Sequence, residues 1–303
     1  MGLLNDRVAL VTGAGRGIGA AVAEGLAAEG AGVVVNDLGV DLEGGGSSAG
    51  PAKDTAERIV ANGGTAIHDN TNVTDFEGCE GMIRRTIEEF GRLDILINVA
   101  GIVRDGMLFK MSEQQWDSVI DVHLKGTFNT TRHASVHWRE NRGGEFRLIN
   151  FVSGSGLMGA PSQPNYAAAK AGIVGFTFSC ANALRGYGVT SNLIAPVATT
   201  RMTETLAGKG TFDYSPENKQ LSPENVVPPV VYLASEASSW LNHRVISSGN
   251  GKIGLHSNFD MQMELETDDA EGLWSNASAA EAMESNFKGA AEQMNHWAPK
   301  TSS

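Results

Sequence analysis

The chain has 303 residues, of which 41% are hydrophobic and 19% are charged, a composition typical of an ordinary globular protein. The formal net charge of −12 disfavours nucleic acid and anionic membrane surfaces as partners, because both repel a diffusely acidic surface. The two cysteines, Cys79 and Cys180, have neither metal-ligand nor redox spacing, so we expect small buried residues in a reducing compartment.

Short strand-forming runs alternate with amphipathic helical stretches through most of the chain. The predicted strands are residues 8–11, 32–36, 65–67, 93–97, 147–152, 189–194 and 244–246. The predicted helices are residues 18–28, 52–61, 76–90, 112–138 (with room for a break), 165–185 and one that ends at Leu233. This alternation predicts a single-domain Rossmann α/β fold, a doubly wound parallel sheet with helices on both faces. In such sheets the ligand lies beyond the carboxyl ends of the strands.

Three segments do not follow this alternation. Residues 39–51 form a Gly- and Ser-rich loop inserted after the second strand, and residues 199–222 are polar and lie where a substrate lid is expected. We therefore place the domain in residues 1–255 and an acidic helical extension in residues 256–303, with a helix over 278–295. The extension could cover a neighbouring subunit or dock loosely on its own.

The first strand runs directly into a glycine-rich turn that opens a helix, with Gly13, Gly17 and Gly19 as the spaced glycines. Glycines permit the sharp turn and let the backbone approach a pyrophosphate, whose charge the helix N-terminus stabilises. Asp37 follows the second strand, where a carboxylate accepts the two ribose hydroxyls of adenosine and repels a 2′-phosphate. The positive charge of Arg16, in contrast, would attract a 2′-phosphate and so favours NADP. We weigh Asp37 more heavily and expect NAD, with NADP less favoured.

Two further polar segments follow strands at the same edge of the predicted sheet. Asn72 and Val73 come after the third strand, and Asn98 to Gly101 end the fourth, so adenine and ribose contacts are expected there. Ordinary strand-to-helix turns would carry the same residues, and that reading stays open.

Tyr166 and Lys170 are four residues apart on a predicted helix and therefore lie on one face of it. A neighbouring ammonium lowers the pKa of a phenol, so Tyr166 is a candidate acid/base for removing the proton of an alcohol. Ser153, just past the fifth strand, could donate a hydrogen bond to the reacting oxygen.

Taken together, the glycine-rich turn, Asn98–Gly101, Ser153 and Tyr166-x-x-x-Lys170 resemble the short-chain dehydrogenase/reductase family over residues 5–255. The resemblance implies that Tyr166 is the acid/base, that Lys170 lowers its pKa and binds the nicotinamide ribose, and that Ser153 positions the substrate oxygen. Pro196 lies in the turn that contacts the nicotinamide. The full set expected at the cofactor is Gly13, Arg16, Gly17, Ile18, Gly19, Asp37, Asn72, Val73, Asn98, Ala100, Gly101, Tyr166, Lys170, Pro196, Val197 and Thr199.

Some positions differ from the common family pattern. His123 stands where the family usually has an asparagine that holds a water of the proton relay; an imidazole can also donate and accept. Val99 replaces a second common asparagine and Val197 a common glycine. These differences, with the inserted loop, resemble a narrower group that includes the (3R)-hydroxyacyl-CoA dehydrogenase module of peroxisomal multifunctional enzyme type 2 and related actinobacterial-type enzymes.

The resemblance implies a dehydrogenase that oxidises a secondary alcohol, a 3-hydroxyacyl-CoA before others. Alternatives are a hydroxysteroid dehydrogenase, a carbonyl or 3-oxoacyl reductase, and, without catalysis, an NAD-binding sensor or structural subunit. We expect a small-molecule substrate, a CoA thioester or a steroid, and a homodimer or homotetramer. His133 and His137 have helical metal spacing but no third ligand nearby, so no metal is expected. No apolar run approaches the ~20 residues that span a bilayer, and we expect a cytoplasmic protein.

Overall fold

The computed structural model describes residues 2–40, 48–198, 218–259, 261, 263–267 and 273–294. The chain divides into two compact units, Met1–His256 and Ser257–Ser303. The division falls one residue beyond the boundary predicted between residues 255 and 256.

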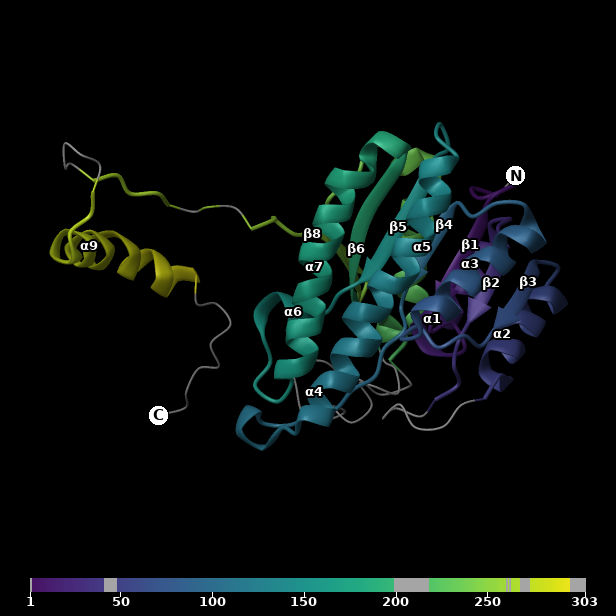
Figure 1. Cartoon of the computed structure of the whole chain (residues 1–303), viewed down its shortest axis with the longest axis horizontal. Helices are drawn as coiled ribbons and strands as arrows, with labels where there is room; N and C mark the ends of the chain where they lie inside the picture. Colours follow the sequence, from purple (N-terminus) through teal and green to yellow (C-terminus); the bar gives the residue numbers. More distant parts are fainter. Residues whose placement is uncertain are drawn as a thin grey trace. The chain divides into compact units, whose positions relative to one another are not determined.

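The first unit is built on one eight-stranded sheet in the order β3-β2-β1-β4-β5-β6-β7-β8 (Figure 1). All neighbouring strands pair in parallel except β7 and β8, which pair antiparallel. The predicted doubly wound Rossmann sheet is therefore confirmed, with one antiparallel strand added at its edge. The strands are β1 Val8–Thr12, β2 Gly32–Asn36, β3 Thr65–Asp69, β4 Ile95–Asn98, β5 Phe146–Phe151, β6 Val189–Val197, β7 Val245–Gly249 and β8 Lys252–Leu255.

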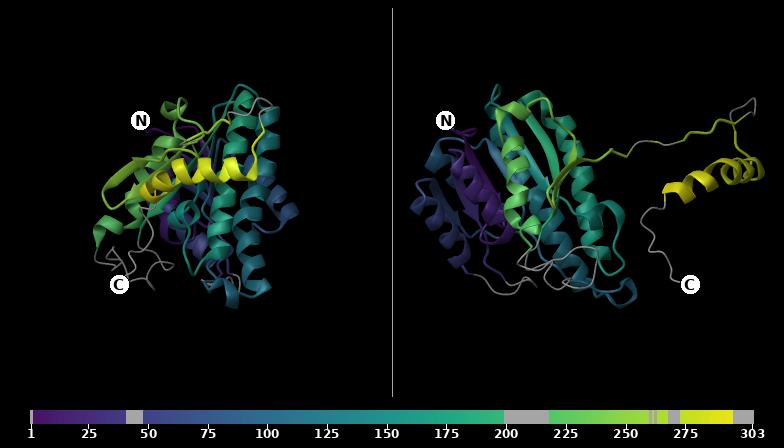
Figure 2. Two further views of the ribbon diagram at one scale, coloured as in Figure 1. Left: turned by 90° about the vertical axis from the view of Figure 1, so that its left-hand side faces the viewer. Right: turned by 180° about the vertical axis from the view of Figure 1, so that it is seen from behind.

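Helices cover both faces of the sheet (Figures 1 and 2). Alternate side chains of the buried strands point to opposite faces, as the period of two of a β-strand requires. Ala9 and Val11 of β1 pack under α1, α2 and α8, whereas Leu10 packs with α3, α5 and α7. The helices of this unit are α1 Gly17–Ala28, α2 Gly50–Ala61, α3 Phe76–Phe90, α4 Glu113–Ile120, α5 Gly126–Glu140, α6 Gly154–Met158, α7 Pro164–Leu184 and α8 Val227–Ala234.

The antiparallel strand β8 was missed by the sequence analysis, although the sequence carries a signal for it. Asn250 and Gly251 link β7 to β8 with φ angles of +53° and +67°. An Asn-Gly pair with both φ angles positive is the preferred two-residue hairpin turn. Exposed Ile253 and the poorly alternating strand pattern hid this signal.

The long predicted helix 112–138 forms as three consecutive segments. Ser112 caps α4 in a capping box with Gln115, and α4 is followed by a π-helical segment, Asp121–Lys125, that leads into α5. Single π-turns inside α-helices occur frequently at functional sites. Here the π segment carries His123.

Helix α7 corrects one expectation. Pro164–Tyr187 is long and apolar enough to span a bilayer by length and composition, so the statement that no apolar run approaches that length is wrong. In the structure this helix contributes Ile173 and Val174 to a core with β6 and β7, as a core helix of a globular domain does. Cys79 and Cys180 are buried and free, as expected.

In the second unit the structure has one helix, α9 Asn276–Met294, within its described part. It begins two residues before the predicted start at 278. Exposed hydrophobic side chains in this unit include Phe259, Met261 and Leu273.

Candidate active site

The turn from β1 into α1 contains glycines that cannot be replaced by another residue unless neighbouring atoms move. Gly13 has a φ of +64°, and a Cβ there would lie 2.6 Å from the Ala100 Cα. A Cβ on Gly19 would lie 2.1 Å from the carbonyl oxygen of Gly13. Left-handed backbone and close approach both require glycine. The turn therefore presents its backbone N–H groups and the N-terminus of α1 at the carboxyl edge of the sheet.

Asp37 lies directly after β2 and is fastened to this turn. Its Oδ2 accepts a hydrogen bond from Gly15 N at 2.9 Å, and its Oδ1 accepts one from Gly39 N at 2.7 Å. A Cβ on Gly15 would lie 2.8 Å from the same carboxylate. The two bonds fix the carboxylate beside the turn, which is where an adenosine ribose is bound in folds of this type. Arg16 is exposed at the rim of the same cavity.

A cavity of about 530 Å³ runs from the glycine-rich turn to α7. The strands β1, β2, β4, β5 and β6 all end at it, so it lies at the carboxyl edge of the sheet, where a ligand site is expected. Of the predicted site residues, these line it: Gly13, Arg16, Gly17, Ile18, Gly19, Asp37, Asn72, Val73, Ala100, Gly101, His123, Tyr166, Lys170 and Pro196.

Three predicted residues contribute without lining the cavity, and one lies outside the described residues. Asn98 is buried, and its side chain bonds Asn150 at 2.9 Å and Thr130 at 2.8 Å. Its amide joins β4, β5 and α5, and its predicted cofactor contact stays a prediction. Val197 ends β6 against Gly249. Ser153 caps α6 and contacts Tyr166 instead. Thr199, with the predicted lid 199–222 up to residue 217, lies outside the described residues.

Tyr166 and Lys170 lie on successive turns of α7 and face the cavity. The Lys170 Nζ donates to the carbonyl oxygen of Phe151 at 2.8 Å and lies 5.6 Å from the centre of the Tyr166 ring. The side chain of Ser153 bonds the Tyr166 hydroxyl. The end of β5 therefore places Ser153 at the phenol, while the carbonyl two residues earlier orients the ammonium.

Burial determines the protonation of both groups. It raises the pKa of Tyr166 to about 12, against the lowering effect of the Ser153 hydrogen bond. It lowers the pKa of Lys170 to about 7. The predicted lowering of the Tyr166 pKa by Lys170 is not found, because desolvation is the larger effect in this arrangement and the ammonium itself is weakened. Ser153 is the side chain that favours the phenolate here.

His123 is buried against Tyr166, with ring centres 5.1 Å apart and planes at 89°. Its Nε2 lies 2.8 Å from the Ile102 carbonyl oxygen and 3.0 Å from the Ile102 nitrogen, and a Cβ on Gly101 would strike its ring. Its Nδ1 is buried without a partner among the described residues. Burial and the Lys170 charge lower the pKa of His123 to about 3, so the ring is neutral. A neutral imidazole with one unused nitrogen can hold a water beside the phenol.

Asn165 was not predicted, yet it positions Tyr166. Its Oδ1 accepts from Tyr166 N at 2.8 Å, and its Nδ2 donates to the carbonyl oxygens of Arg104 at 3.0 Å and Gln115 at 2.9 Å. One fully buried amide therefore ties the start of α7 to α4 and to the segment before it. The signal that could have found it is its place at the start of the helix, where asparagine is favoured.

The two histidines with metal spacing make packing contacts with aromatic rings. His133 is buried and its ring lies 4.4 Å from that of Phe76, while His137 contacts Phe146. Among the residues that the structure describes, no group of three His, Cys, Asp or Glu side chains could hold a metal ion.

The cavity fits a nicotinamide dinucleotide by the chemistry of its two ends. One end has backbone N–H donors and a helix N-terminus for the pyrophosphate, next to the Asp37 carboxylate for a ribose. The other end has Lys170, a donor for ribose hydroxyls, and the Tyr166 phenol. The described residues therefore suit such a group, with Pro196 and Gly101 between the ends.

Comparisons with known proteins support this assignment. Residues 7–210 match the model of the short chain dehydrogenase family. A hydroxyacyl-CoA dehydrogenase, ChsB1, of Mycobacterium tuberculosis is 40% identical over 275 residues, covering 88% of this chain and 84% of the relative. A 3-oxoacyl-[acyl-carrier-protein] reductase of Synechocystis is 38% identical over 255 residues, covering 84% of this chain and 99% of the relative.

A solved structure is similar over nearly the whole chain. It is that of a short chain dehydrogenase from Mycobacterium avium, 42% identical, with a TM-score of 0.82 and coverage of 94% of this chain and 96% of that one. Peroxisomal multifunctional enzymes type 2 are also similar to this chain, which covers less than half of their length. The narrower resemblance inferred from the sequence is confirmed by these relatives.

Proposed function

The chain belongs to the short chain dehydrogenase family and is an NAD(P)-dependent oxidoreductase that acts on CH–OH groups; on that premise we propose that it oxidises a 3-hydroxyacyl-CoA with NAD. The observation that carries the proposal is the shared cavity of Asp37, Lys170 and Tyr166, with Ser153 at the phenol. The similarity to a hydroxyacyl-CoA dehydrogenase supports the substrate class.

The residues divide the chemistry among them. A nicotinamide dinucleotide held at Lys170 and Asp37 would supply the acceptor for the hydride that leaves the carbinol carbon. Ser153 holds the substrate hydroxyl. Tyr166 gives up its own proton and, as the phenolate, takes the proton of that hydroxyl as the C–O bond gains carbonyl character. His123 and Lys170 line the route by which the phenol loses its proton, through a water at the unused His123 nitrogen. In the reverse direction the same groups return the proton.

The preference for NAD over NADP rests on Asp37. Its carboxylate is fixed by Gly15 N and Gly39 N, so it cannot turn away from a 2′-phosphate without losing both bonds. Arg16 is exposed and free to lie elsewhere on the rim. A fixed negative charge next to the ribose disfavours the phosphorylated cofactor.

The test follows the absorbance of the reduced cofactor with NAD and NADP against 3-hydroxyacyl-CoAs, hydroxysteroids and simple alcohols. We expect the highest kcat/KM with a 3-hydroxyacyl-CoA and NAD. A higher value with a hydroxysteroid would replace the proposed substrate. Asp37→Ala should narrow the preference for NAD by about tenfold or more, and Asp54→Ala, an acidic residue on α2, serves as the matched control.

A second candidate is a 3-oxoacyl reductase, favoured by the similarity to the Synechocystis enzyme. A higher kcat/KM for 3-oxoacyl thioesters with the reduced cofactor at neutral pH would support it. Tight NAD binding without turnover of any compound would instead support a sensor or structural subunit. A cytoplasmic homodimer or homotetramer stays our proposal for location and assembly, with light scattering as the test of the second.

A further inference from the structure

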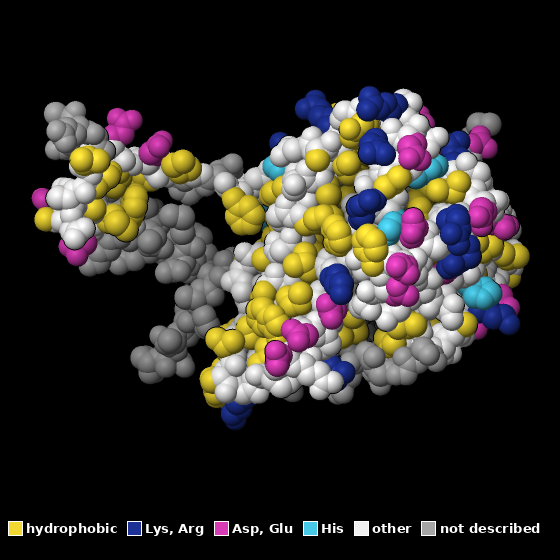
Figure 3. Space-filling view, in the orientation of Figure 1, with side chains coloured by type: hydrophobic (Ala, Val, Ile, Leu, Met, Phe, Trp, Pro, Cys, Tyr) yellow, Lys and Arg dark blue, Asp and Glu magenta, His cyan; other side chains and the backbone are white. Residues whose placement is uncertain are grey.

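An exposed apolar patch lies beside the candidate active site. We call Met107, Leu108, Phe109, Trp116 and Met158 the mouth patch. Their exposed fractions range from 39% for Trp116 to 77% for Phe109. Figure 3 shows hydrophobic side chains gathered over the α4 and α6 end of the first unit. Contiguous exposed apolar surface of this kind marks a binding site more often than chance exposure does.

The three segments of the mouth patch are joined at one point, Asp105–Gly106. The Gly106 N–H donates to the Ser162 carbonyl oxygen at 2.8 Å, and the Gln163 Nε2 donates to the Asp105 carboxylate at 3.1 Å. The Gln115 Nε2 reaches the Asp105 carbonyl oxygen at 3.5 Å. In the sequence, Met107 comes directly after Gly106 and Trp116 directly after Gln115. Met158 is the last residue of α6, four positions before Ser162. The three segments that carry the patch are therefore held together by one frame of hydrogen bonds.

The same frame is tied to the catalytic tyrosine. Asn165, the residue before Tyr166, donates to the carbonyl oxygens of Arg104 and Gln115 at 3.0 and 2.9 Å. Arg104 and Gln114, on either side of the frame, line the catalytic cavity. Two of the segments that carry the mouth patch therefore also supply residues to the wall of that cavity.

The charges of the region select between the two ends of an acyl-CoA. The patch-bearing segments carry Asp105, Glu113 and Asp117 against Arg104 and Lys110, so they offer no net positive charge. Coenzyme A carries several phosphate charges, which a surface without net positive charge does not attract. An alkyl chain gains from Met, Leu, Phe and Trp side chains instead. Only the acyl tail suits this surface.

We infer that the mouth patch is the subsite for the alkyl chain of a medium- or long-chain acyl thioester, an inference that rests on the proposed function. The carbinol carbon lies at Tyr166, the tail leaves the cavity past Arg104 and Gln114, and its distal carbons lie on Leu108 and Phe109. The enzyme therefore prefers longer chains over a four-carbon one.

The experiment compares 3-hydroxydecanoyl-CoA with 3-hydroxybutyryl-CoA in the wild type and the double variant L108S/F109S. Both side chains are largely exposed, so folding is preserved. We expect kcat/KM for the ten-carbon substrate to fall about tenfold or more, because two large apolar contacts are lost. The value for the four-carbon substrate should stay within about twofold. The control L3S/V60S removes two exposed apolar side chains elsewhere and should change neither value.

Equal losses for both chain lengths, or no loss for either, would overturn the inference. So would a change in oligomeric state of L108S/F109S by light scattering, which would make the patch an interface between copies of this chain. Calorimetric binding of decanoyl-CoA and butyryl-CoA to the cofactor-loaded protein gives a readout without turnover. Tighter binding of decanoyl-CoA that L108S/F109S abolishes supports the subsite even if no hydroxyacyl-CoA is oxidised and the proposed function fails; equal binding of the two overturns it.

Discussion

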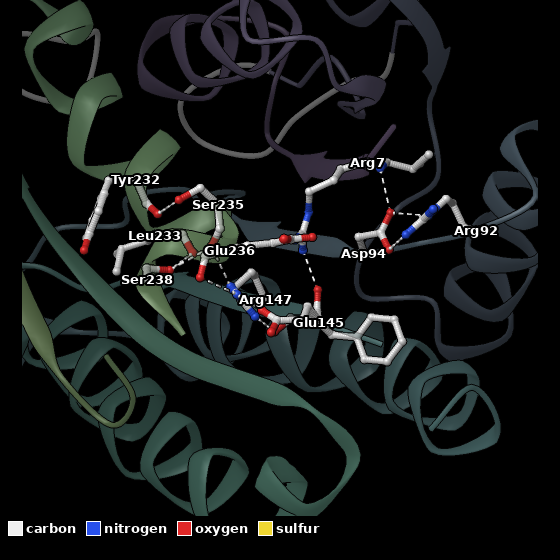
Figure 4. Close-up of polar contacts among 12 residues, drawn as sticks. Arg7, Arg92, Asp94, Glu145, Arg147, Tyr232, Leu233, Ser235, Glu236 and Ser238 are labelled. Atoms are coloured by element: carbon white, nitrogen blue, oxygen red, sulfur yellow. Dashed lines mark hydrogen bonds and ion pairs between the residues drawn. The ribbon is translucent and has the colours of Figure 1, made fainter. Parts of the chain in front are cut away.

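The amino edge and the carboxyl edge of the sheet differ in how their buried ionisable side chains are partnered. At the amino edge, before β1 and β4 and in β5, ionic side chains are matched to one another and to the backbone (Figure 4). At the carboxyl edge, buried ionisable groups face a cavity with few partners. The strands that carry both edges are the same, so the difference does not come from the sheet itself.

The amino edge shows what stability requires. Asp94 is buried, and its carboxylate accepts from Val8 N at 2.8 Å and from two nitrogens of Arg92 at 2.7 and 2.8 Å. Arg147 is 1% exposed and donates to the carbonyl oxygens of Ser235 at 2.9 Å and Phe146 at 3.0 Å. Such partners offset the free energy of removing a charge from water. This edge joins β1, β4, β5 and the end of α8.

The carboxyl edge shows what chemistry requires. Lys170, Tyr166 and His123 are buried, and each pKa is moved away from its usual value in the direction that favours the uncharged form. Shifts of this size cluster at functional sites, where burial and neighbouring groups set the pKa values of the reacting side chains. If stability and chemistry are separated in this way, mutations should disturb the two edges independently.

The largest expected effect is on catalysis alone. Tyr166→Phe removes the hydroxyl that Ser153 contacts, so the substrate proton has no acceptor, and kcat should fall by about 10³-fold or more. The free energy of unfolding should stay within about 1 kcal/mol of the wild type, because the ring remains packed on His123. Turnover is measured by cofactor absorbance and stability by urea. Retained turnover would remove Tyr166 from the chemistry.

The amino edge should respond in the opposite way. Arg147→Met removes the buried guanidinium that donates to the carbonyl oxygens of Ser235 and Phe146, although Ser235 keeps the Ser238 hydroxyl as a donor. We expect a loss of about 2–4 kcal/mol in the free energy of unfolding. The kcat of the folded protein should be unchanged. Arg84→Gln, in an exposed pair with Glu88, is the control and should cost less than about 0.5 kcal/mol. A fall in kcat for Arg147→Met would mean that the edges are coupled.

These two edges were not equally visible in the sequence. The spacings of Gly13, Asp37, Tyr166 and Lys170 follow from strand, turn and helix geometry, and the structure places all four at the cavity of the carboxyl edge. For Asn98 the spacing gives the end of a strand but not the direction in which its amide bonds. The amino edge was not predicted at all: Arg147 reads as one charged residue in an apolar strand, and its partners come from residues 235 and 236, almost ninety positions away.

The sequence located His123 at the relay position but did not explain what its ring does there. The π segment turns its ring toward Tyr166 and leaves Nδ1 without a partner among the described residues. His123→Ala should lower kcat by about 10²-fold, because the water beside the phenol loses its anchor. His123→Asn, which restores a donor and an acceptor, should recover most of that loss. Equal activity of the two variants would assign His123 a packing role only.

The pH dependence of the same group sharpens this test. Since burial lowers the pKa of His123 to about 3, its charge does not change between pH 5 and 9. The pH–rate profiles of the wild type and His123→Asn should therefore have the same shape in that range. A limb near pH 6.5 that disappears in His123→Asn would show that the imidazole titrates during turnover.

A last prediction concerns the stability that is lost at the carboxyl edge because Lys170 is buried there. Its pKa is about 7 in the folded chain, against a usual value of 10.5, so the unfolded chain binds more protons between those values. The free energy of unfolding therefore rises with pH through that window, by up to ~1.4 kcal/mol per unit. Below pH 7 the full penalty of the buried ammonium is present.

Lys170→Met should remove this slope and be more stable than the wild type at pH 6, with the advantage vanishing toward pH 10. Lys53→Met, at an exposed position, should leave the slope unchanged. If Lys170→Met were instead less stable at pH 6, its bond to Phe151 would outweigh its burial, and the carboxyl edge would be held together in the same way as the amino edge.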